Sequence, residues 1–427
     1  MKIQNLHQLF LECNAVCTDT RTLQANNMFF ALKGDNFNGN TYAEKALELG
    51  AKYAIIDEAN YQSNSNTILV DNVLETLQEL ATYHRTYLNI PIIGLTGSNG
   101  KTTTKELINA VLSQKHKTTA TIGNLNNHIG VPLTLLSMTK DTEIGIVEMG
   151  ANHLKEIAFL SQIAQPNYGY ITNFGKAHLE GFGSLEGVVQ GKTELYKYLL
   201  KTKGLAFINA NDSTQIEKSQ SLNTYTFGTN PNTAQVTVTL NGANPFVEAS
   251  YNNLTVKSHL IGTYNFNNIS AAIAIGNYFK VNDDDIQTAI EQYTPTNNRS
   301  QIIEKPNQKI ILDAYNANPT SMKAALESFA ALNDDKKIAI IGDMFELGAD
   351  AELEHQDIVK LASGLAIHKI ITIGKQFYAT PFASDKLLKY DTFEDFNAKF
   401  QDIDLTNTTL LIKASRGMKL ERILDLL

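Results

Sequence analysis

The sequence predicts an α/β protein of three domains. Apolar, strand-like runs alternate with amphipathic helical stretches through residues 89–297 and again through 298–427, a pattern typical of parallel sheets covered by helices. A chain of 427 residues also exceeds the size at which a single hydrophobic core stops growing. We therefore place domains at residues 1–88, 89–297 and 298–427, without an internal repeat.

The first domain is predicted to mix short strands and helices. The run "MFFAL" at 28–32 predicts a strand, and "NFNGN" at 36–40 predicts a turn. Residues 42–51 are typical of a helix that ends at a glycine, and 52–57 of a strand. A helix over 72–88 then leads to Pro91.

The second domain begins with a regular alternation that implies a parallel sheet with helices on both faces. The predicted strands are 90–97, 143–150 and 168–173, and the predicted helices are 101–115 and 153–163. Residues 224–262 differ in composition from the preceding segment, because Thr, Val and Asn dominate. We expect antiparallel strands there. A helix is expected to return at 265–280.

The third domain repeats the α/β pattern. Four apolar runs predict strands at 309–315, 337–344, 369–374 and 409–415. Pro319 marks a helix start, where its missing N–H costs nothing.

Net charge, apolar run length and cysteine count disfavour several classes of function. A net charge of −8 disfavours a general nucleic-acid or membrane-surface role. Apolar runs stay shorter than the ~18 residues of a membrane span, and the first residues lack the pattern of a signal peptide. The two cysteines, Cys13 and Cys17, predict neither a zinc site nor a disulfide framework. We expect a cytoplasmic protein without membrane insertion or nucleic-acid partners.

A glycine-rich loop, "GSNGKT" at 97–102, follows the strand at 90–97 and precedes a helix. Glycines let the backbone approach an anion, and the helix N-terminus adds partial positive charge. Lys101 can then reach terminal phosphates, and the Thr102 hydroxyl can bind Mg²⁺. The general phosphate-loop pattern requires glycine at position 95, which is Leu95, so a structural turn is the alternative to a nucleotide site.

Three further side chains are candidates for metal or phosphate chemistry. Glu148 ends a predicted strand, at the edge where α/β sheets bind ligands, and His178 follows another strand. Lys192 lies near the start of a helix. The alternatives are a solvated strand end, a structural histidine and a surface lysine.

Seven motifs extend this pattern over the chain. In order they are "TGSNGKTTTKE", "GNLNNHIGVPLTLL", "EMGANHLKEI", "TNFGKAHLEGFGS", "GTYNFNNISAAIA", "DAYNANPTSMKAAL" and "KASRGMKLERIL". This order resembles the Mur ligase family over essentially the whole length, including "TDTRTLQANNMFFALKGDNFNGN" at the front. "YNANP" and "EMGAN" resemble the members that join D-alanyl-D-alanine to UDP-MurNAc-tripeptide, since other members usually carry a Tyr-Ala-His type sequence in place of "YNANP".

The resemblance implies a fold, partners and a reaction. The N-terminal domain would hold the UDP end of the sugar substrate, a central P-loop-type domain would bind ATP and Mg²⁺, and a C-terminal Rossmann-like domain would close over both. The substrates would be UDP-MurNAc-tripeptide and D-Ala-D-Ala, and the protein a monomer. A substrate carboxylate would attack the γ-phosphate of ATP, and the dipeptide amine would then attack the acyl phosphate.

The resemblance also assigns residues. ATP would meet Thr96, Gly97, Ser98, Asn99, Gly100, Lys101, Thr102, Thr103, Asn265, Asn268, Arg299, Asp313, Asn316 and Asn318. Metal binding is implied for Thr102, Glu148, His178 and Lys192, the last as a carbamate. Catalytic contacts would come from Lys101, Lys192, His178 and Arg299. Substrate would meet Asp19, Thr20, Arg21, Asn126, Asn127, Lys413, Ser415 and Arg416.

Two departures from the family pattern stand out. Asn38-Gly39-Asn40 replaces a frequent Asp-Gly-His, and Asn298 replaces the glycine that commonly precedes Arg299, which removes backbone freedom. The alternatives within the superfamily are a muropeptide-recycling ligase and a folylpolyglutamate synthase. Outside it, a nucleotide-dependent switch or a phosphotransferase stays open, as does the third residue of the tripeptide, meso-diaminopimelate or lysine.

Overall fold

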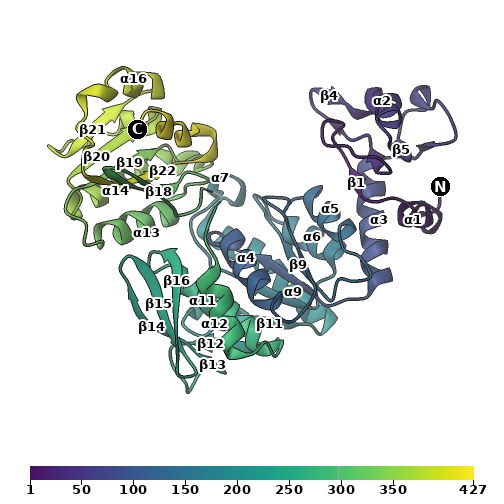
Figure 1. Cartoon of the computed structure of the whole chain (residues 1–427), viewed down its shortest axis with the longest axis horizontal. Coiled ribbons are helices and arrows are strands. Elements are labelled where there is room, and N and C mark those ends of the chain that lie inside the picture. The colour runs from purple at the N-terminus through teal and green to yellow at the C-terminus, as the bar shows by residue number, and fades with distance from the viewer. Residues whose placement is uncertain (297) are drawn as a thin grey trace.

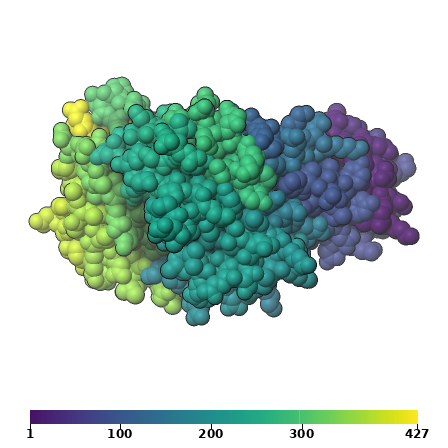
Figure 2. Space-filling model, turned by 90° about the horizontal axis from the view of Figure 1, so that it is seen from below, coloured from purple at the N-terminus to yellow at the C-terminus, as the bar shows by residue number. Residues whose placement is uncertain are grey.

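The computed structural model describes residues 1–296 and 298–427. Three α/β bodies follow one another along the chain, and the N-terminal and C-terminal ones contact opposite sides of the central one (Figure 1). The space-filling view shows the same elongated arrangement, with the two chain ends at opposite ends of the molecule (Figure 2). The predicted fold class is confirmed. Among the described residues, no helix is both long and apolar enough to cross a membrane.

The N-terminal body is a parallel sheet in the order β1-β2-β5-β6. The central strand β2 is buried along its whole length, which explains its unbroken apolar run. Asn72 begins the long helix α3 by accepting hydrogen bonds from the amides of Leu74 and Glu75. The elements are α1 Ile3–Leu11, β1 Val16–Cys17, β2 Met28–Phe30, α2 Ala43–Glu48, β5 Tyr53–Ile56, β6 Thr67–Leu69 and α3 Val73–Leu88.

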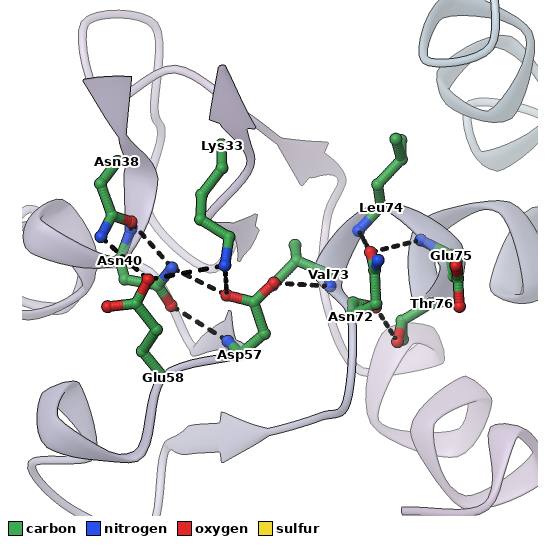
Figure 3. A network of polar contacts seen from close by, with 10 residues as sticks. All are labelled: Lys33, Asn38, Asn40, Asp57, Glu58, Asn72, Val73, Leu74, Glu75 and Thr76. Carbon is green, nitrogen blue, oxygen red and sulfur yellow. Dashed lines mark hydrogen bonds and ion pairs between the residues drawn. The ribbon is translucent and has the colours of Figure 1, made fainter. Parts of the chain in front are cut away.

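The turn after β2 is fixed by a buried asparagine (Figure 3). The short strands β3 (Lys33–Gly34) and β4 (Phe37–Asn38) lead into it. Asn40 is fully buried; its Nδ2 donates to Asp57 Oδ1 at 2.9 Å, and its Oδ1 accepts the Asp57 amide at 3.0 Å. Lys33 Nζ lies 3.0 Å from the same carboxylate. Asn40 stands where the family pattern often has histidine, and its hydrogen bonds to Asp57 hold the loop in place.

We expect Asn40→Ala to lower the free energy of unfolding by about 2 kcal/mol, because buried groups of Asp57 lose their partners. A lower urea midpoint for the intact chain would register the change. Asn36→Ala, at an exposed position of the same turn, serves as the control and should stay within about 0.5 kcal/mol. Equal midpoints for the two variants would contradict this account of the turn.

A histidine pair joins α1, α3 and the central body. His84 Nε2 lies 2.9 Å from the carbonyl of Met138, which can only accept, so His84 Nε2 carries a proton. His84 Nδ1 then accepts from His7 Nε2 at 3.0 Å. His7 Nδ1 is left as a buried lone pair with no partner among the described residues. Burial, and then the neighbouring His84, lower the pKa of His7 to about 4.

This pair should make the fold acid-sensitive. The pKa of His7 is lower in the folded chain than the usual value near 6.5, so the unfolded chain binds more protons between those values. Stability should fall as pH drops from about 6.5 towards 4. Urea midpoints measured across that interval should decline less steeply for His7→Gln than for the wild type, whereas His259→Gln, at an exposed position, should follow the wild type. Parallel curves for His7→Gln and wild type would disprove the assignment.

The central body carries a parallel sheet in the order β13-β12-β11-β10-β7-β9-β8. Helix α4 packs with α11 on one face, so that the phosphate loop between β7 and α4 lies at the carboxyl edge of the sheet. Its strands are β7 Ile92–Thr96, β8 Thr118–Ala120, β9 Ile144–Glu148, β10 Tyr168–Ile171, β11 Leu205–Asn209, β12 Asn223–Gly228 and β13 Val236–Thr237. Its helices include α4 Lys101–Leu112, α5 Gly130–Leu136, α6 Glu156–Ala164, α7 Leu179–Phe182, α8 Leu185–Lys192, α9 Glu194–Thr202, α10 Ser213–Lys218, α11 Asn265–Tyr278 and α12 Asp283–Gln292.

The antiparallel prediction for 224–262 needs one correction. The antiparallel sheet β14-β15-β16 begins only at Thr239, with β14 Thr239–Ala243, β15 Phe246–Tyr251 and β16 Leu254–Ile261. The strands before it, β12 and β13, instead extend the parallel sheet. The run "QVTVTL" therefore divides between two sheets, which composition alone does not reveal.

The C-terminal body is a sheet in the order β17-β18-β22-β19-β20-β21. All four predicted strands are present and parallel, and two edge strands, β17 and β21, join them, β17 antiparallel to β18. Pro319 occupies the first turn of α13, which Asn318 begins with a capping box. The elements include β17 Gln301–Lys305, β18 Gln308–Asp313, α13 Pro319–Ala330, β19 Lys337–Gly342, α14 Ala351–Gly364, β20 Lys369–Ile373, α15 Lys375–Ala379, β21 Leu387–Tyr390, α16 Phe393–Ala398 and β22 Thr408–Lys413.

Candidate active site

The phosphate loop requires two of its glycines. Gly97 has φ +142°, and a Cβ there would lie 2.0 Å from the Thr172 hydroxyl oxygen. Gly100 has φ +76°, and a Cβ there would lie 2.7 Å from Asn268 Oδ1. Both positions combine a left-handed backbone with close packing, which only glycine accepts without strain. The loop is therefore built without glycine at position 95, where buried Leu95 belongs to the strand β7.

Lys101 folds back over this loop. Its Nζ donates to the carbonyls of Gly97 at 2.8 Å and Ser98 at 3.3 Å. Burial lowers the pKa of Lys101, Glu148 opposes that shift, and the nearby Arg299 adds to it. The Lys101 ammonium thus lies against the carbonyls of the loop and feels the charges of both Glu148 and Arg299.

A cavity of about 570 Å³ opens over the loop and is lined by residues of both the central and the C-terminal bodies. Its walls come from the phosphate loop, the ends of β9 and β18, the start of α11 and the interdomain segment near Arg299. The sequence-predicted residues that line it are Ser98, Asn99, Gly100, Lys101, Thr102, Thr103, Asn126, Asn127, Glu148, His178, Asn265, Asn268, Arg299, Asp313, Asn316 and Lys413.

Glu148 ends β9 as a buried carboxylate that is half satisfied. Its Oε1 accepts a hydrogen bond from Asn126 Nδ2 at 2.8 Å. Its Oε2 is buried and lacks a hydrogen-bond partner among the described residues. Thr102, also buried, lines the same cavity. A bare carboxylate oxygen and a threonine hydroxyl in one cavity are oxygen donors of the kind that suit Mg²⁺.

Lys192 lies at the end of α8, beneath the cavity wall, and is 1% exposed. Its Nζ donates to the carbonyl of Ala151 at 3.0 Å and lies 5.0 Å from the centre of the Phe182 ring. Burial, and then the charge of Lys101, hold the pKa of Lys192 well below its usual range. The charges of Glu156 and Glu194 oppose this shift without cancelling it. The surface-lysine alternative is therefore wrong.

His178 precedes α7 with φ +53° and lines the cavity. Its Nδ1 is hydrogen-bonded to the carboxylate of Glu346, which comes from the C-terminal body. In the part of the chain that the structure describes, His, Cys, Asp and Glu side chains do not gather in threes around a metal-sized space. A metal here would draw on hydroxyl groups and ligand oxygens as well.

Asn265 and Asn268 belong to a buried chain of hydrogen bonds between α11 and α4. Thr104 Oγ1 donates to Asn268 Oδ1 at 3.0 Å, and Asn268 Nδ2 donates to Asn265 Oδ1 at 2.7 Å. Asn265 Nδ2 in turn donates to the Ile261 carbonyl at 2.7 Å. Both amides therefore shape the cavity wall by fixing one helix against the other.

Arg299 lies in the connection to the C-terminal body. Its guanidinium carbon stands 3.7 Å from the centre of the Tyr315 ring, a stacked cation–π contact. Asn298 and Ser300, on either side, have φ +52°. Asparagine tolerates this left-handed region better than other non-glycine residues, so the departure from glycine keeps the required backbone shape.

Asp313 and Lys413 end the neighbouring strands β18 and β22 and pair with each other. Lys413 Nζ lies 2.5 Å from Asp313 Oδ2 and 3.2 Å from the carbonyl of Asn316. The sequence predicted that Asp313 meets ATP and that Lys413 meets substrate; the structure joins them in one ion pair, in which Lys413 is buried and Asp313 part-buried. Asn318 lies outside the cavity lining, and its Nδ2 donates to Asn99 Oδ1 in the phosphate loop at 2.7 Å.

The other predicted residues do not line the cavity. Arg21 forms a paired hydrogen bond with Asp19 at the surface of the N-terminal body, beside Thr20. Ser415 Oγ accepts the Phe345 amide, and Arg416 pairs with Glu421 at 3.3 Å. The residues outside the lining are Asp19, Thr20, Arg21, Thr96, Gly97, Lys192, Asn318, Ser415 and Arg416.

Sequence reasoning missed several contributors. Tyr315 lies inside the quoted motif "DAYNANPTSM", and an aromatic between an acid and an asparagine could have signalled a stacking partner for Arg299. Asn173 holds the phosphate loop by accepting the Asn99 amide at 3.1 Å. Glu346 lies far from every quoted motif, and nothing in the sequence links it to His178.

Comparison with protein families matches three segments in order. Residues 12–85 match the model described as Mur ligase family, catalytic domain. Residues 95–276 match the Mur ligase middle domain, and residues 298–416 match the Mur ligase, glutamate ligase domain.

Individual relatives extend along nearly the whole chain. The UDP-N-acetylmuramoyl-tripeptide–D-alanyl-D-alanine ligase of Bacillus subtilis (strain 168) is 36% identical over 96% of this chain and 92% of its own length. MurF from Acinetobacter baumannii superposes with a TM-score of 0.87 at 29% identity, covering 99% of this chain and 98% of its own. MurF ligase from Thermotoga maritima, solved in complex with ADP, superposes with a TM-score of 0.83 at 26% identity, covering 97% of each chain. With relatives of this identity over nearly its full length, the chain belongs to the Mur ligase family.

Proposed function

We propose that this protein is an ATP-dependent amide ligase that adds D-alanyl-D-alanine to UDP-N-acetylmuramoyl-tripeptide and so forms the peptidoglycan pentapeptide precursor. The observation that carries the proposal is the cavity itself, which joins the phosphate loop of the central body to Arg299 and Lys413 of the C-terminal segment. Relatives that cover nearly the whole chain bear the name of that activity.

In the proposed reaction the terminal carboxylate of the tripeptide attacks the γ-phosphorus, and the bond to the β,γ-bridging oxygen of ATP breaks, which releases ADP. The amine of the dipeptide then attacks the acyl carbon, loses a proton, and phosphate leaves with the former carboxylate oxygen. Lys101 and Arg299 neutralise charge on the transferring phosphoryl group. Closure of the C-terminal body excludes water, which would hydrolyse the acyl phosphate.

The remaining ATP contacts are proposed as the sequence assigned them. The loop residues Thr96, Gly97, Ser98, Asn99, Gly100 and Thr103 would surround the phosphates, with Asn265, Asn268, Asp313, Asn316 and Asn318 around the rest of the nucleotide. Substrate would meet Asp19, Thr20, Arg21, Asn126, Asn127, Lys413, Ser415 and Arg416. Lys413 is paired with Asp313. A ligand that binds either side chain must therefore compete with this ion pair or bind both of its members.

Thr102, Glu148, His178 and a carbamate on Lys192 are proposed to hold Mg²⁺, which supplies charge neutralisation at the phosphates. The bare Glu148 Oε2 supports the metal role. A depressed pKa supports the carbamate, since only a neutral amine can attack the carbon of CO₂ and lose a proton to form one. The carbamate would turn a buried amine into an anion, the kind of oxygen ligand that Mg²⁺ prefers.

We further propose the domain division 1–88, 89–297 and 298–427, a monomer, and a cytoplasmic location. Asn297 lies outside the described residues, so the second boundary is set by sequence. Both tripeptides, with meso-diaminopimelate or lysine third, should be tested as substrates.

The test of the function measures ADP release with UDP-MurNAc-tripeptide, with and without D-Ala-D-Ala, and the mass of the product. We expect ADP release to require the dipeptide and the pentapeptide to appear in equal amount. ADP release that ignores the dipeptide, with a phosphorylated tripeptide as end product, would instead identify a phosphotransferase. Activity only with a folate or a free muropeptide would favour another ligase of the superfamily.

A further inference from the structure

The C-terminal body contacts a short segment of the central body, residues 176–180, which carries His178. This segment leads into α7, which lies beside the C-terminal sheet (Figure 1). The amide of Lys176 donates to Thr320 Oγ1 at 2.9 Å, and its Nζ pairs with Glu354 at 2.5 Å. The amide of Glu180 donates to the carbonyl of Glu346 at 3.2 Å. The Glu346 carboxylate reaches His178 Nδ1 between these contacts.

The loop that presents Glu346 is held from within its own domain. The Met344 amide donates to His355 Nε2 at 3.0 Å, and the Phe345 amide donates to Ser415 Oγ at 3.0 Å. Glu346 itself has φ +62°, an unusual backbone shape for glutamate that persists only where the surroundings impose it. The carboxylate is therefore presented by a fixed loop.

The chemistry of the pair fixes the form of the histidine. A carboxylate only accepts hydrogen bonds, so Nδ1 of His178 must carry the proton. When the ring is neutral, Nε2 then keeps its lone pair, and His178 lines the same cavity as Glu148 and Thr102. Carboxylates that fix histidine in this way raise its strength as a ligand.

We propose that Glu346 is a positioning residue: it holds His178 with Nε2 available to the cavity only when the C-terminal body is docked, and so couples docking to completion of the metal site. The metal part of this inference rests on the proposed function, while the tautomer part stands on the contact alone.

The first test reads the tautomer in the protein without metal or nucleotide. Nitrogen-15 NMR of the neutral ring should show Nδ1 protonated and Nε2 unprotonated in the wild type. Glu346→Ala should move the ring towards the reverse tautomer, and Glu346→Gln, whose amide oxygen can still accept, should restore part of the wild-type signal. An unchanged tautomer in Glu346→Ala would overturn the proposal.

The second test measures the Mg²⁺ concentration for half-maximal turnover. Glu346→Ala should raise it about tenfold or more, as losses of outer-shell partners do. Glu354→Ala is the matched control, since it removes another contact of the same segment without touching His178, and it should stay within about twofold of wild type. Equal effects of the two variants would contradict the proposal, because Glu346 would then contribute only to contact between the two bodies. If the wild type lacks the proposed activity, the NMR test alone still decides the tautomer.

Discussion

Lys101→Ala should lower kcat by about 10³-fold, with a much smaller change in the KM for the tripeptide. The Lys101 ammonium lies over the phosphate loop, where it donates hydrogen bonds to the carbonyls of Gly97 and Ser98. Once phosphates take that place, the ammonium is free to follow the negative charge that builds up on the transferring group. Steady-state ADP release at saturating ATP measures the loss.

Lys117→Ala is the matched control for that experiment, since this exposed lysine follows the same helix away from the cavity. It should retain the wild-type kcat, and both variants should share the wild-type thermal midpoint. A Lys101→Ala enzyme with near-normal kcat would show that the loop does not act on phosphate in the reaction.

Lys192→Ala should lower turnover by about 100-fold and recover part of it with added short carboxylates such as acetate or formate. The reason is that the side chain is buried, donates to the Ala151 carbonyl as its one hydrogen bond in the part of the chain that the structure describes, and has a depressed pKa. Its removal leaves a space beneath the cavity in which a small carboxylate can replace the carbamate. Activity is measured against carboxylate concentration at fixed Mg²⁺.

Two controls make this result interpretable. Lys197→Ala, an exposed position on α9, should be fully active and indifferent to carboxylates. Lys192→Gln fills the space with a neutral side chain and should be inactive without rescue. Full activity of Lys192→Ala, or equal stimulation of every variant by acetate, would leave Lys192 with a packing role alone.

Much of the fold was predictable because its signals are local. Buried parallel strands read as unbroken apolar runs, as in β7 and β19, and Pro319 and Gly50 mark helix ends by their own geometry. The edge strands β17 and β21 were missed because they are only half buried, so their sequences lack that pattern. The placement of β13 depends on which neighbour it meets, and composition does not encode the neighbour.

The candidate site divides in the same way. Lys101 and Glu148 could be located because each lies next to a strand end that topology brings to one sheet edge. The pairing of Asp313 with Lys413, 100 residues apart, depends on β18 and β22 being neighbours. The contact of Glu346 with His178 depends on how two bodies dock, and no single segment carries that information.

The most direct test of the central claim follows an oxygen atom. UDP-MurNAc-tripeptide labelled with ¹⁸O in its terminal carboxylate is incubated with ATP, Mg²⁺ and D-Ala-D-Ala, and the released phosphate is analysed by mass spectrometry. Activation through an acyl phosphate predicts one carboxylate oxygen in each phosphate and one amide bond for each ADP. Phosphate without the label would contradict it, because the phosphoryl group would then have passed to water or another acceptor instead of the carboxylate.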